Sequence, residues 1–449
     1  MSTHNYKTYI NDLLIQLAGS GYGSYINTTY TGAPTCADDV VLMASNINDL
    51  QIQLNIASDY ANQERYQIHP DKSRCVSFGV NHPASIILDG TAIVVGEKLT
   101  HLGINRYSNT PSSNCVPQDR ISTARRTAYL LMGSGFHGVN GISPHISIKI
   151  YRSYVLPRLM YGLESIVLKT KHITELEAYH KKTLRELQSL PVRTASSAVY
   201  LMSGIPPLEA LLDQQIANLL SMVGSGDSKL LAEIGTNQLA RKSNRSSSWF
   251  VYSSHRLTKY GLDPLAIIEG RIKKVRIKSI IMNYWASTLI EEAKTKTSLR
   301  FLKVDSCNLN VPHPVWQSVG CNPADTRKAI QKARILTGTY ILQSNKANFN
   351  QFEVDPTCPL CGAAPEDRLH FITACVTLQD IRAKYMENME SLIPGFKSIE
   401  SSQQLQIILD PFTSNHNVTG DRAVLEAISR NLIFSLHCKR QRILNESSS

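Results

Sequence analysis

The chain has 449 residues, 42% of them hydrophobic, which is enough for about two to four domains with buried cores and excludes a disordered chain. Lysine and arginine outnumber aspartate and glutamate by 47 to 36, and this net charge of +11 favours a polyanionic partner such as nucleic acid. The first residues lack the layout of a signal peptide, and no apolar run reaches transmembrane length, so we expect an intracellular protein of the nucleus or cytoplasm that is neither secreted nor inserted in a membrane.

The first 112 residues predict a compact α+β unit. Val40–Met43 is a β-branched and aliphatic run that predicts a buried strand, and apolar residues spaced over 47–61 predict a helix with Ser45 or Asn46 as its N-cap. Further strands are expected in three places: after a Pro-Asp turn within 66–78, in a hairpin around Asp89-Gly90 within 86–95, and over 99–104.

Asp38 and Asp39 stand directly before the first of these strands, at the turn of a predicted hairpin. Two adjacent carboxylates repel each other, and either water or a divalent cation with oxygen ligands relieves the repulsion. An Asp-Asp turn without a metal is common in globular proteins. The dipeptide therefore leaves both a turn and a metal site open.

Beyond Pro117 the hydrophobic pattern becomes helical. Periodic stretches predict helices over 119–134, 145–163, 173–190 and 208–223. One face of the third helix is expected to consist of five residues, Ile173, Leu176, His180, Leu184 and Leu187. The serine-rich segment 243–254 that follows predicts a linker.

A basic run follows the linker. It places Arg271, Lys273, Lys274, Arg276 and Lys278 among aliphatic residues, a pattern that fits an edge strand or a helix with a solvated face. The same five cations are candidates for direct contact with nucleic-acid phosphates. Both interpretations stay open.

A cysteine-rich segment near the C-terminus has the spacing Cys358-x2-Cys361-x8-His370-x4-Cys375. A Cys-x2-Cys pair followed by glycine forms a tight turn that directs two thiolates at one ion, and a histidine and a cysteine on a following helix complete a tetrahedron. The alternative is three buried free cysteines and a surface histidine. For an intracellular chain, the spacing favours a zinc site, structural in role because four protein ligands leave no position for water.

Several motifs carry a family resemblance. TCADDVVLMA, at 35–44, is similar to a polymerase signature of an aromatic residue, Ala, Asp and Asp followed by an apolar strand, with Cys36 in place of the usual Tyr or Phe. Other segments resemble further parts of the same enzyme: the lead-in YINDLL at 9–14, the palm motif HPDKS at 69–73, the primer grip HLGI at 101–104, the thumb at 154–164 and 187–194, and the C-terminal region at 333–345 with the cysteine cluster. The chain thus resembles the C-terminal part of the reverse transcriptase of a non-LTR retrotransposon, LINE-type and jockey-like.

The resemblance implies an α+β fold in five parts. They are a partial polymerase palm of antiparallel strands with a helix (1–112), a helical thumb (113–240), a basic linker and helical region (241–349), a CCHC zinc-binding motif (350–385) and a C-terminal helical tail (386–449). It also implies an RNA template and a DNA primer as partners.

The resemblance further implies a two-metal nucleotidyl transfer with magnesium held by Asp38 and Asp39, and with Lys72 as proton donor to the leaving pyrophosphate or as a phosphate contact. The family's enzymes carry another metal-binding aspartate on an earlier palm strand and a glycine-rich segment beneath the nucleotide. This sequence has neither, since Asp12 in the lead-in is the one acidic residue before Asp38. Whether the chain is an active enzyme is therefore left open, and we expect an RNA-directed DNA polymerase by descent that is inactive by itself.

Two other classes of function remain. A non-catalytic nucleic-acid-binding zinc protein would have the same fold without turnover, so primer extension separates it from the polymerase. A structural zinc domain in a protein scaffold would not bind RNA in a salt-dependent way, because phosphate contacts weaken as salt rises.

Overall fold

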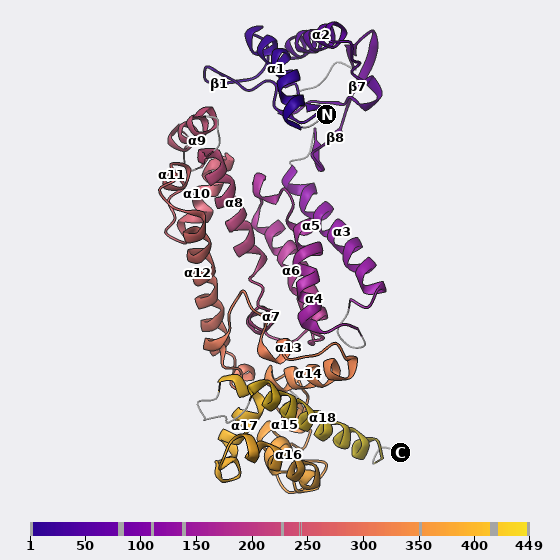
Figure 1. Ribbon diagram of the computed structural model, residues 1–449, viewed down its shortest axis with the longest axis vertical. Helices are drawn as coiled ribbons and strands as arrows, with labels where there is room; N and C mark the ends of the chain where they lie inside the picture. Colours follow the sequence, from indigo (N-terminus) through magenta and orange to yellow (C-terminus); the bar gives the residue numbers. More distant parts are fainter. Residues whose placement is uncertain are drawn as a thin grey trace.

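The computed structural model describes residues 3–79, 85–108, 112–136, 141–225, 229–241, 243, 245–349, 353–413 and 421–446. Across these residues the protein has a mixed α+β fold in which helices predominate. A small N-terminal unit holds the β-strands and lies at one end of an elongated body of helices, and β8 and β9 lie where the chain passes from one to the other (Figure 1).

In the described residues, two helices and seven short strands form the N-terminal unit, and two further strands, β8 and β9, connect it to the helical body. The helices are α1 (Thr3–Gly19) and α2 (Ile47–Gln63). The strands are β1 (Tyr25–Ile26), β2 (Thr29–Tyr30), β3 (Thr35–Cys36), β4 (Asp39–Val40), β5 (Cys75–Val76), β6 (Ser85–Leu88), β7 (Thr91–Gly96), β8 (Lys98–His101) and β9 (Ile104–Tyr107). They make three antiparallel two-stranded sheets, β1–β2, β3–β4 and β8–β9, and one three-stranded sheet in the order β5–β7–β6, in which β5 runs parallel to β7.

The turn and cap predictions for this unit are confirmed. Asn46 is the N-cap of α2, and its side chain accepts a hydrogen bond of 2.8 Å from the backbone N–H of Asp49. The β6–β7 hairpin turns at Asp89-Gly90, where both residues have positive φ, as a two-residue hairpin turn requires. A short helical turn at Pro70–Lys72 precedes β5, as expected.

The buried strand predicted over Val40–Met43 is wrong in length and burial. β4 ends at Val40, and Met43 is exposed. The backbone N–H groups of Val41 and Met43 still donate to the carbonyls of Pro34 and Gly32, at 3.1 and 2.7 Å. Pro34 has no N–H to donate in return, so the ladder beyond β4 is one-sided and regular pairing stops.

The helical stretches predicted beyond Pro117 are confirmed. The helices are α3 (Ser112–Gly133), α4 (Pro144–Ile150), α5 (Leu156–Met160), α6 (Thr170–Leu187), α7 (Ser196–Ser203) and α8 (Leu208–Ser225). A π-helical turn at Tyr151–Val155 joins α4 to α5, and this wider turn accommodates Pro157, which cannot donate a backbone hydrogen bond.

The predicted face of α6 is buried. Leu176, Leu184 and Leu187 are fully enclosed, and Ile173 packs against the same core. His180 is enclosed as well, and its ring lies 2.6 Å from the Tyr151 hydroxyl through Nδ1 and 3.1 Å from the Pro206 carbonyl oxygen through Nε2. Because a carbonyl only accepts, Nε2 carries the proton and Nδ1 accepts from Tyr151.

In the part of the chain that the structure describes, ten more α-helices complete the body. They are α9 (Lys229–Arg241), α10 (Trp249–Thr258), α11 (Pro264–Ile268), α12 (Lys274–Lys294), α13 (Pro314–Gln317), α14 (Pro323–Leu336), α15 (Gln343–Asn348), α16 (Gln379–Leu392), α17 (Ser401–Leu409) and α18 (Arg422–Glu446). None of the helices that the structure describes is long and apolar enough to cross a membrane.

The linker predicted at 243–254 is wrong in its second half, because α10 begins at Trp249. The Trp249 indole N–H donates to the carbonyl of Glu164 at 2.7 Å, and the ring packs against the main core, so this segment is bound to the helical body. Residue 244 of the predicted linker lies outside the described residues.

One continuous hydrophobic core runs through the helical body, from Ile104 to Leu436. The last helix, α18, packs on α14 and α16 and buries Leu432, Ile433 and Leu436. Helices α14 to α18 lie together at one end of the body (Figure 1), and buried residues of these C-terminal helices belong to this core. The N-terminal unit has two small cores of its own, one between α1 and α2 and one between α2 and the β5–β7–β6 sheet.

Candidate metal centre

Two cysteines of the cluster lie on a tight turn. The backbone N–H of Gly362 donates to the carbonyl of Cys358 at 2.8 Å, and Gly362 has a φ of 67°, a left-handed conformation that favours glycine. The Cys358 N–H in turn donates to the carbonyl of Ala364 at 2.8 Å, and this hydrogen bond closes the loop at its base. This turn directs the sulfurs of Cys358 and Cys361 to the same side, as the Cys-x2-Cys-Gly spacing predicts.

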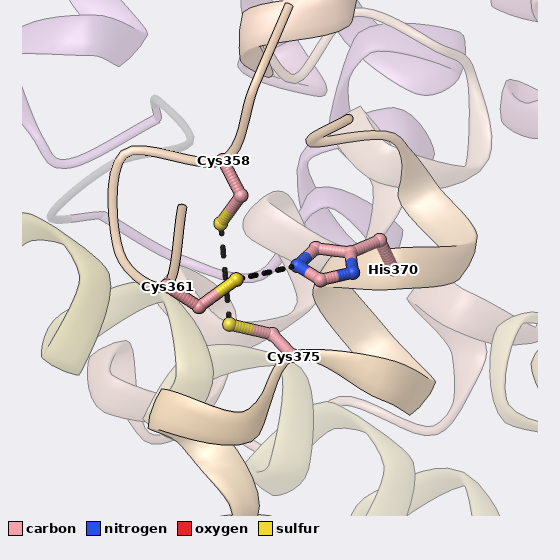
Figure 2. Close-up of side chains that lie close together, drawn as sticks. All are labelled: Cys358, Cys361, His370 and Cys375. Atoms are coloured by element: carbon pink, nitrogen blue, oxygen red, sulfur yellow. Dashed lines mark hydrogen bonds between the residues drawn. The ribbon is translucent and has the colours of Figure 1, made fainter. Parts of the chain in front are cut away.

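The other two candidate ligands lie at the two ends of a π-helical turn, His370–Ala374. In an α-helix, residues five apart point about 140° away from each other. Here the Cys375 N–H donates to the carbonyl of His370 at 2.8 Å, and this wider turn brings the two side chains together. The histidine and the cysteine thus face the same point as the turn residues (Figure 2).

The four ligand atoms form a compact group. Cys358 Sγ lies 4.0 Å from Cys375 Sγ, Cys361 Sγ lies 3.3 Å from His370 Nε2, and all four atoms are within 4.8 Å of one another (Figure 2). A zinc ion bonded to sulfur at about 2.3 Å and to nitrogen at about 2.0 Å in a tetrahedron requires S···S and S···N separations of about 3.8 and 3.5 Å. These four residues can hold a metal ion such as zinc.

Backbone amides surround the sulfurs. Burial raises the pKa of the Cys358 thiol to about 12, although the N–H groups of Leu360 and Cys361 point at its sulfur and oppose the rise. Burial also acts to raise the pKa of Cys361, but donors that include the N–H of Ala363 outweigh it and lower that pKa. A divalent cation would favour the thiolate form at each sulfur, and these amides would stabilise the thiolates further.

Burial lowers the pKa of His370, which favours the neutral imidazole that a metal ligand requires. The His370 backbone N–H donates to the Asp367 carboxylate at 2.8 Å and fixes the start of the turn. The donor set of three sulfurs and one neutral nitrogen is the type that selects zinc among common divalent ions.

Buried ion pairs and hydrogen bonds connect the metal-binding loop to the helical body. The carboxylate of Glu366, fully buried, accepts from Arg440 on α18 at 2.6 and 2.7 Å in a bidentate pair, and from the backbone N–H of Gln343 at 2.8 Å. The buried Arg382 of α16 donates to the carbonyls of Ile372 and Cys375 at 3.0 and 2.7 Å. The loop is thus held from α15, α16 and α18.

Sequence reasoning missed these supporting residues. Glu366 lies between the second cysteine and the histidine. An isolated glutamate in the sequence does not indicate that it pairs with Arg440, 74 residues away. The arginine that follows the cluster by seven residues, Arg382, gave a local signal, since an arginine near a helix-terminal cysteine can bond the last carbonyls of the turn.

The predicted magnesium ligands lie in the N-terminal unit. Asp38 is in the turn of the β3–β4 hairpin and Asp39 begins β4, and both are exposed. Lys72 is exposed at the end of the helical turn Pro70–Lys72, which precedes β5 of the three-stranded sheet and is not part of the β3–β4 hairpin. Throughout the described ranges, the Cys/His cluster is the one group of three or more histidine, cysteine, aspartate or glutamate side chains close enough to share a metal ion, and magnesium at Asp38 and Asp39 stays a prediction.

The basic run forms the start of α12. Lys274, Arg276 and Lys278 are exposed on the helix, and Lys273 is its N-cap residue. The solvated helix face is therefore confirmed and the edge strand is wrong. Arg271, before the helix, is paired with Glu269 at 2.5 Å and with Asp263 at 3.8 Å, whereas contact of the run with phosphates stays a prediction.

No protein-family model matches the chain, and no curated protein matches it.

Proposed function

We propose that the protein is the C-terminal part of a reverse transcriptase of the non-LTR retrotransposon type, in which a zinc-stabilised helical body binds nucleic acid. The observation that carries the proposal is the four-residue cluster, whose donor set and ligand distances suit zinc and which occupies the place of the zinc region in the family that the motifs resemble. The net charge of +11 supports a polyanionic partner.

The zinc ion is structural in this proposal. Cys358, Cys361, His370 and Cys375 supply four protein ligands, which leaves no open position for water or substrate. When bound, zinc would cross-link the loop to the π-helical turn. Glu366 bonds the loop to α15 and α18, and Arg382 bonds the π-helical turn to α16. The ion would therefore help to hold these three helices in place.

Nucleotidyl transfer is not part of the isolated chain's activity. The β3–β4 hairpin supports descent from a polymerase because it presents two adjacent carboxylates, Asp38 and Asp39, on a strand–turn–strand. A two-metal centre needs further carboxylate ligands. Asp12 is the one acidic residue before this hairpin, and it lies on helix α1. There its charge adds to the effect of burial, which raises the pKa of Tyr60.

Primer extension and binding, measured on the same preparation, test the proposal. We expect no template-dependent dNTP incorporation in magnesium or manganese, and binding of RNA or primer–template that weakens steeply as salt rises. Incorporation that disappears in Asp38→Ala would show that the chain is an active polymerase. Absent or salt-independent binding would reject the nucleic-acid partner and favour a protein scaffold.

A further inference from the structure

A large open pocket lies where the C-terminal end of α12 meets the segment 295–306 and the start of α18. Its volume is about 1230 Å³. Pockets for drug-sized ligands have volumes of about 300 to 1,000 Å³, so this one suits an extended ligand. The elements that line it, the C-terminal end of α12 and the start of α18, lie in the part of the helical body that also contains α15 and α16 (Figure 1).

Most of the charged side chains that line this pocket are basic. The five cations are Lys294, Lys296, Arg300, Lys303 and Arg422. Asp305 is the one carboxylate among the lining residues, and it pairs with Lys294 at 3.0 Å. These cations outnumber Asp305 and the Glu291 carboxylate, which pairs with Lys294 at 3.2 Å from outside the lining, so the charge around the pocket is positive and attracts anions, and the concave shape concentrates that field.

The floor of the pocket is apolar. Leu299, Leu302 and Val304 are buried beneath it, and the half-buried ring of Phe412 forms part of the wall. Lys296 and Arg300, by contrast, are exposed at the rim. An apolar floor with an aromatic ring in the wall, inside a cationic rim, suits a ligand with planar apolar groups on an anionic chain, and unpaired nucleobases on a phosphodiester backbone have this chemistry.

The metal-binding segment holds one wall of the pocket in place. Arg368, two residues before His370, donates to the carbonyls of Ser298 and Ile335 at 3.2 Å each. Its guanidinium also lies 4.6 Å from the ring centroid of Phe301, next to Arg300. The pocket and the metal centre are therefore one connected structure.

We propose that this pocket binds the phosphodiester backbone of a single-stranded nucleic acid, with phosphates at the cationic rim and a base against the apolar floor. The proposal rests on the nucleic-acid-binding function proposed above and gives that function a location. A duplex keeps its bases stacked inside, so it would meet the rim and leave the floor empty. An acidic protein segment would meet the same cations without using the floor.

The test compares two double variants of the full zinc-loaded chain by fluorescence anisotropy with single-stranded RNA and DNA of one sequence. Lys296→Gln with Arg300→Gln removes two rim cations, and Lys384→Gln with Arg442→Gln removes two exposed cations, one on α16 and one on α18, as the control. Losing two phosphate contacts should reduce the salt slope by about 1.4, which is about 25-fold in affinity at about 0.1 M salt. We expect this loss in the rim variant and unchanged binding in the control.

Each outcome has one meaning. Loss on RNA and DNA alike supports a site for the shared backbone, and loss on RNA alone supports it and identifies RNA as the ligand. If the rim variant binds as tightly as the wild type, the pocket is not the binding site, and the proposed function is unaffected. If the wild-type chain binds neither strand, both the binding site and the proposed function are rejected. A rim variant that loses binding to a polyglutamate peptide but keeps nucleic-acid binding would assign the pocket to an acidic protein.

Discussion

The N-terminal unit and the helical body are built differently. The N-terminal unit divides its apolar residues between two small cores, and its sheets have two or three short strands each. The helical body has one core that connects elements from β9 to α18, supported by fully buried ion pairs. Small cores provide little stability, so the difference indicates that the helical body is the more stable part and that the N-terminal unit unfolds more easily.

Removing the metal should have the largest effect and should act within the helical body. Structural zinc contributes about 10 to 16 kcal/mol of apparent binding free energy in finger peptides, so a strong chelator should unfold the cluster segment and loosen the contacts of Glu366 and Arg382. Hydrogen exchange should show lost protection over 353–385 and unchanged protection in the N-terminal unit. Protection that is the same with and without chelator would mean that the cluster folds without metal.

Breaking a buried ion pair should have the next largest effect. Lys332 on α14 is fully buried and lies 2.6 Å from the carboxylate of Glu426 on α18. Lys332→Met leaves the Glu426 carboxylate in the core without its partner, which should destabilise the helical body by about 3 to 5 kcal/mol in chemical denaturation.

The matched control for this pair is Lys332→Met combined with Glu426→Leu. Replacing both charges removes the unpaired carboxylate, so the double variant should recover most of the lost stability. If the double variant is as unstable as the single one, the loss comes from packing and not from the unpaired charge.

Equal core truncations should separate the two regions directly. Leu88 of the N-terminal unit and Leu432 of α18 are both buried, and each change to alanine should cost about 2 to 5 kcal/mol. Leu88→Ala should speed proteolysis between residues 3 and 96 and leave the helical body resistant. Leu432→Ala should lower the unfolding midpoint of the helical body as a whole. A Leu88→Ala variant in which both regions are cleaved faster would contradict two separate folding units.

Acid should weaken the helical body through His180. Burial lowers the pKa of His180 below that of an exposed histidine, about 6.5, so the unfolded chain binds the proton more readily. The neutral form is therefore favoured in the folded state, full stability is present above about pH 6.5, and stability falls as pH decreases through that value. Denaturation of His180→Gln at several pH values should show a smaller slope than the wild type, and an equal slope would contradict this assignment.

Local signals in the sequence predicted local features. The Asn46 cap, the Asp89-Gly90 turn and the Cys-x2-Cys-Gly knuckle depend on a few neighbouring residues whose backbone preferences are strong, and all three are present. The early end of β4 also has a local cause, Pro34, but its effect depends on which strand β4 pairs with.

Contacts between distant residues could not be predicted. Trp249 reaches Glu164, Arg440 reaches Glu366 and Arg368 reaches Ser298, over 85, 74 and 70 residues of chain. Neither periodicity nor spacing contains information on such pairings, because they depend on how the helices pack. The pocket at the end of α12 was missed for the same reason: its cations come from α12, the following turns and the start of α18.

Metal analysis of the purified chain tests the central claim most directly. We predict one zinc ion per chain in the wild type and none in Cys361→Ser, with Cys307→Ser, outside the cluster, as a matched control that keeps its zinc. The cluster variant should also be cleaved by protease within 353–385 while the wild type resists. A wild-type chain that contains no zinc and still resists protease in that segment would show that the four side chains are ordinary buried residues, and would contradict the account.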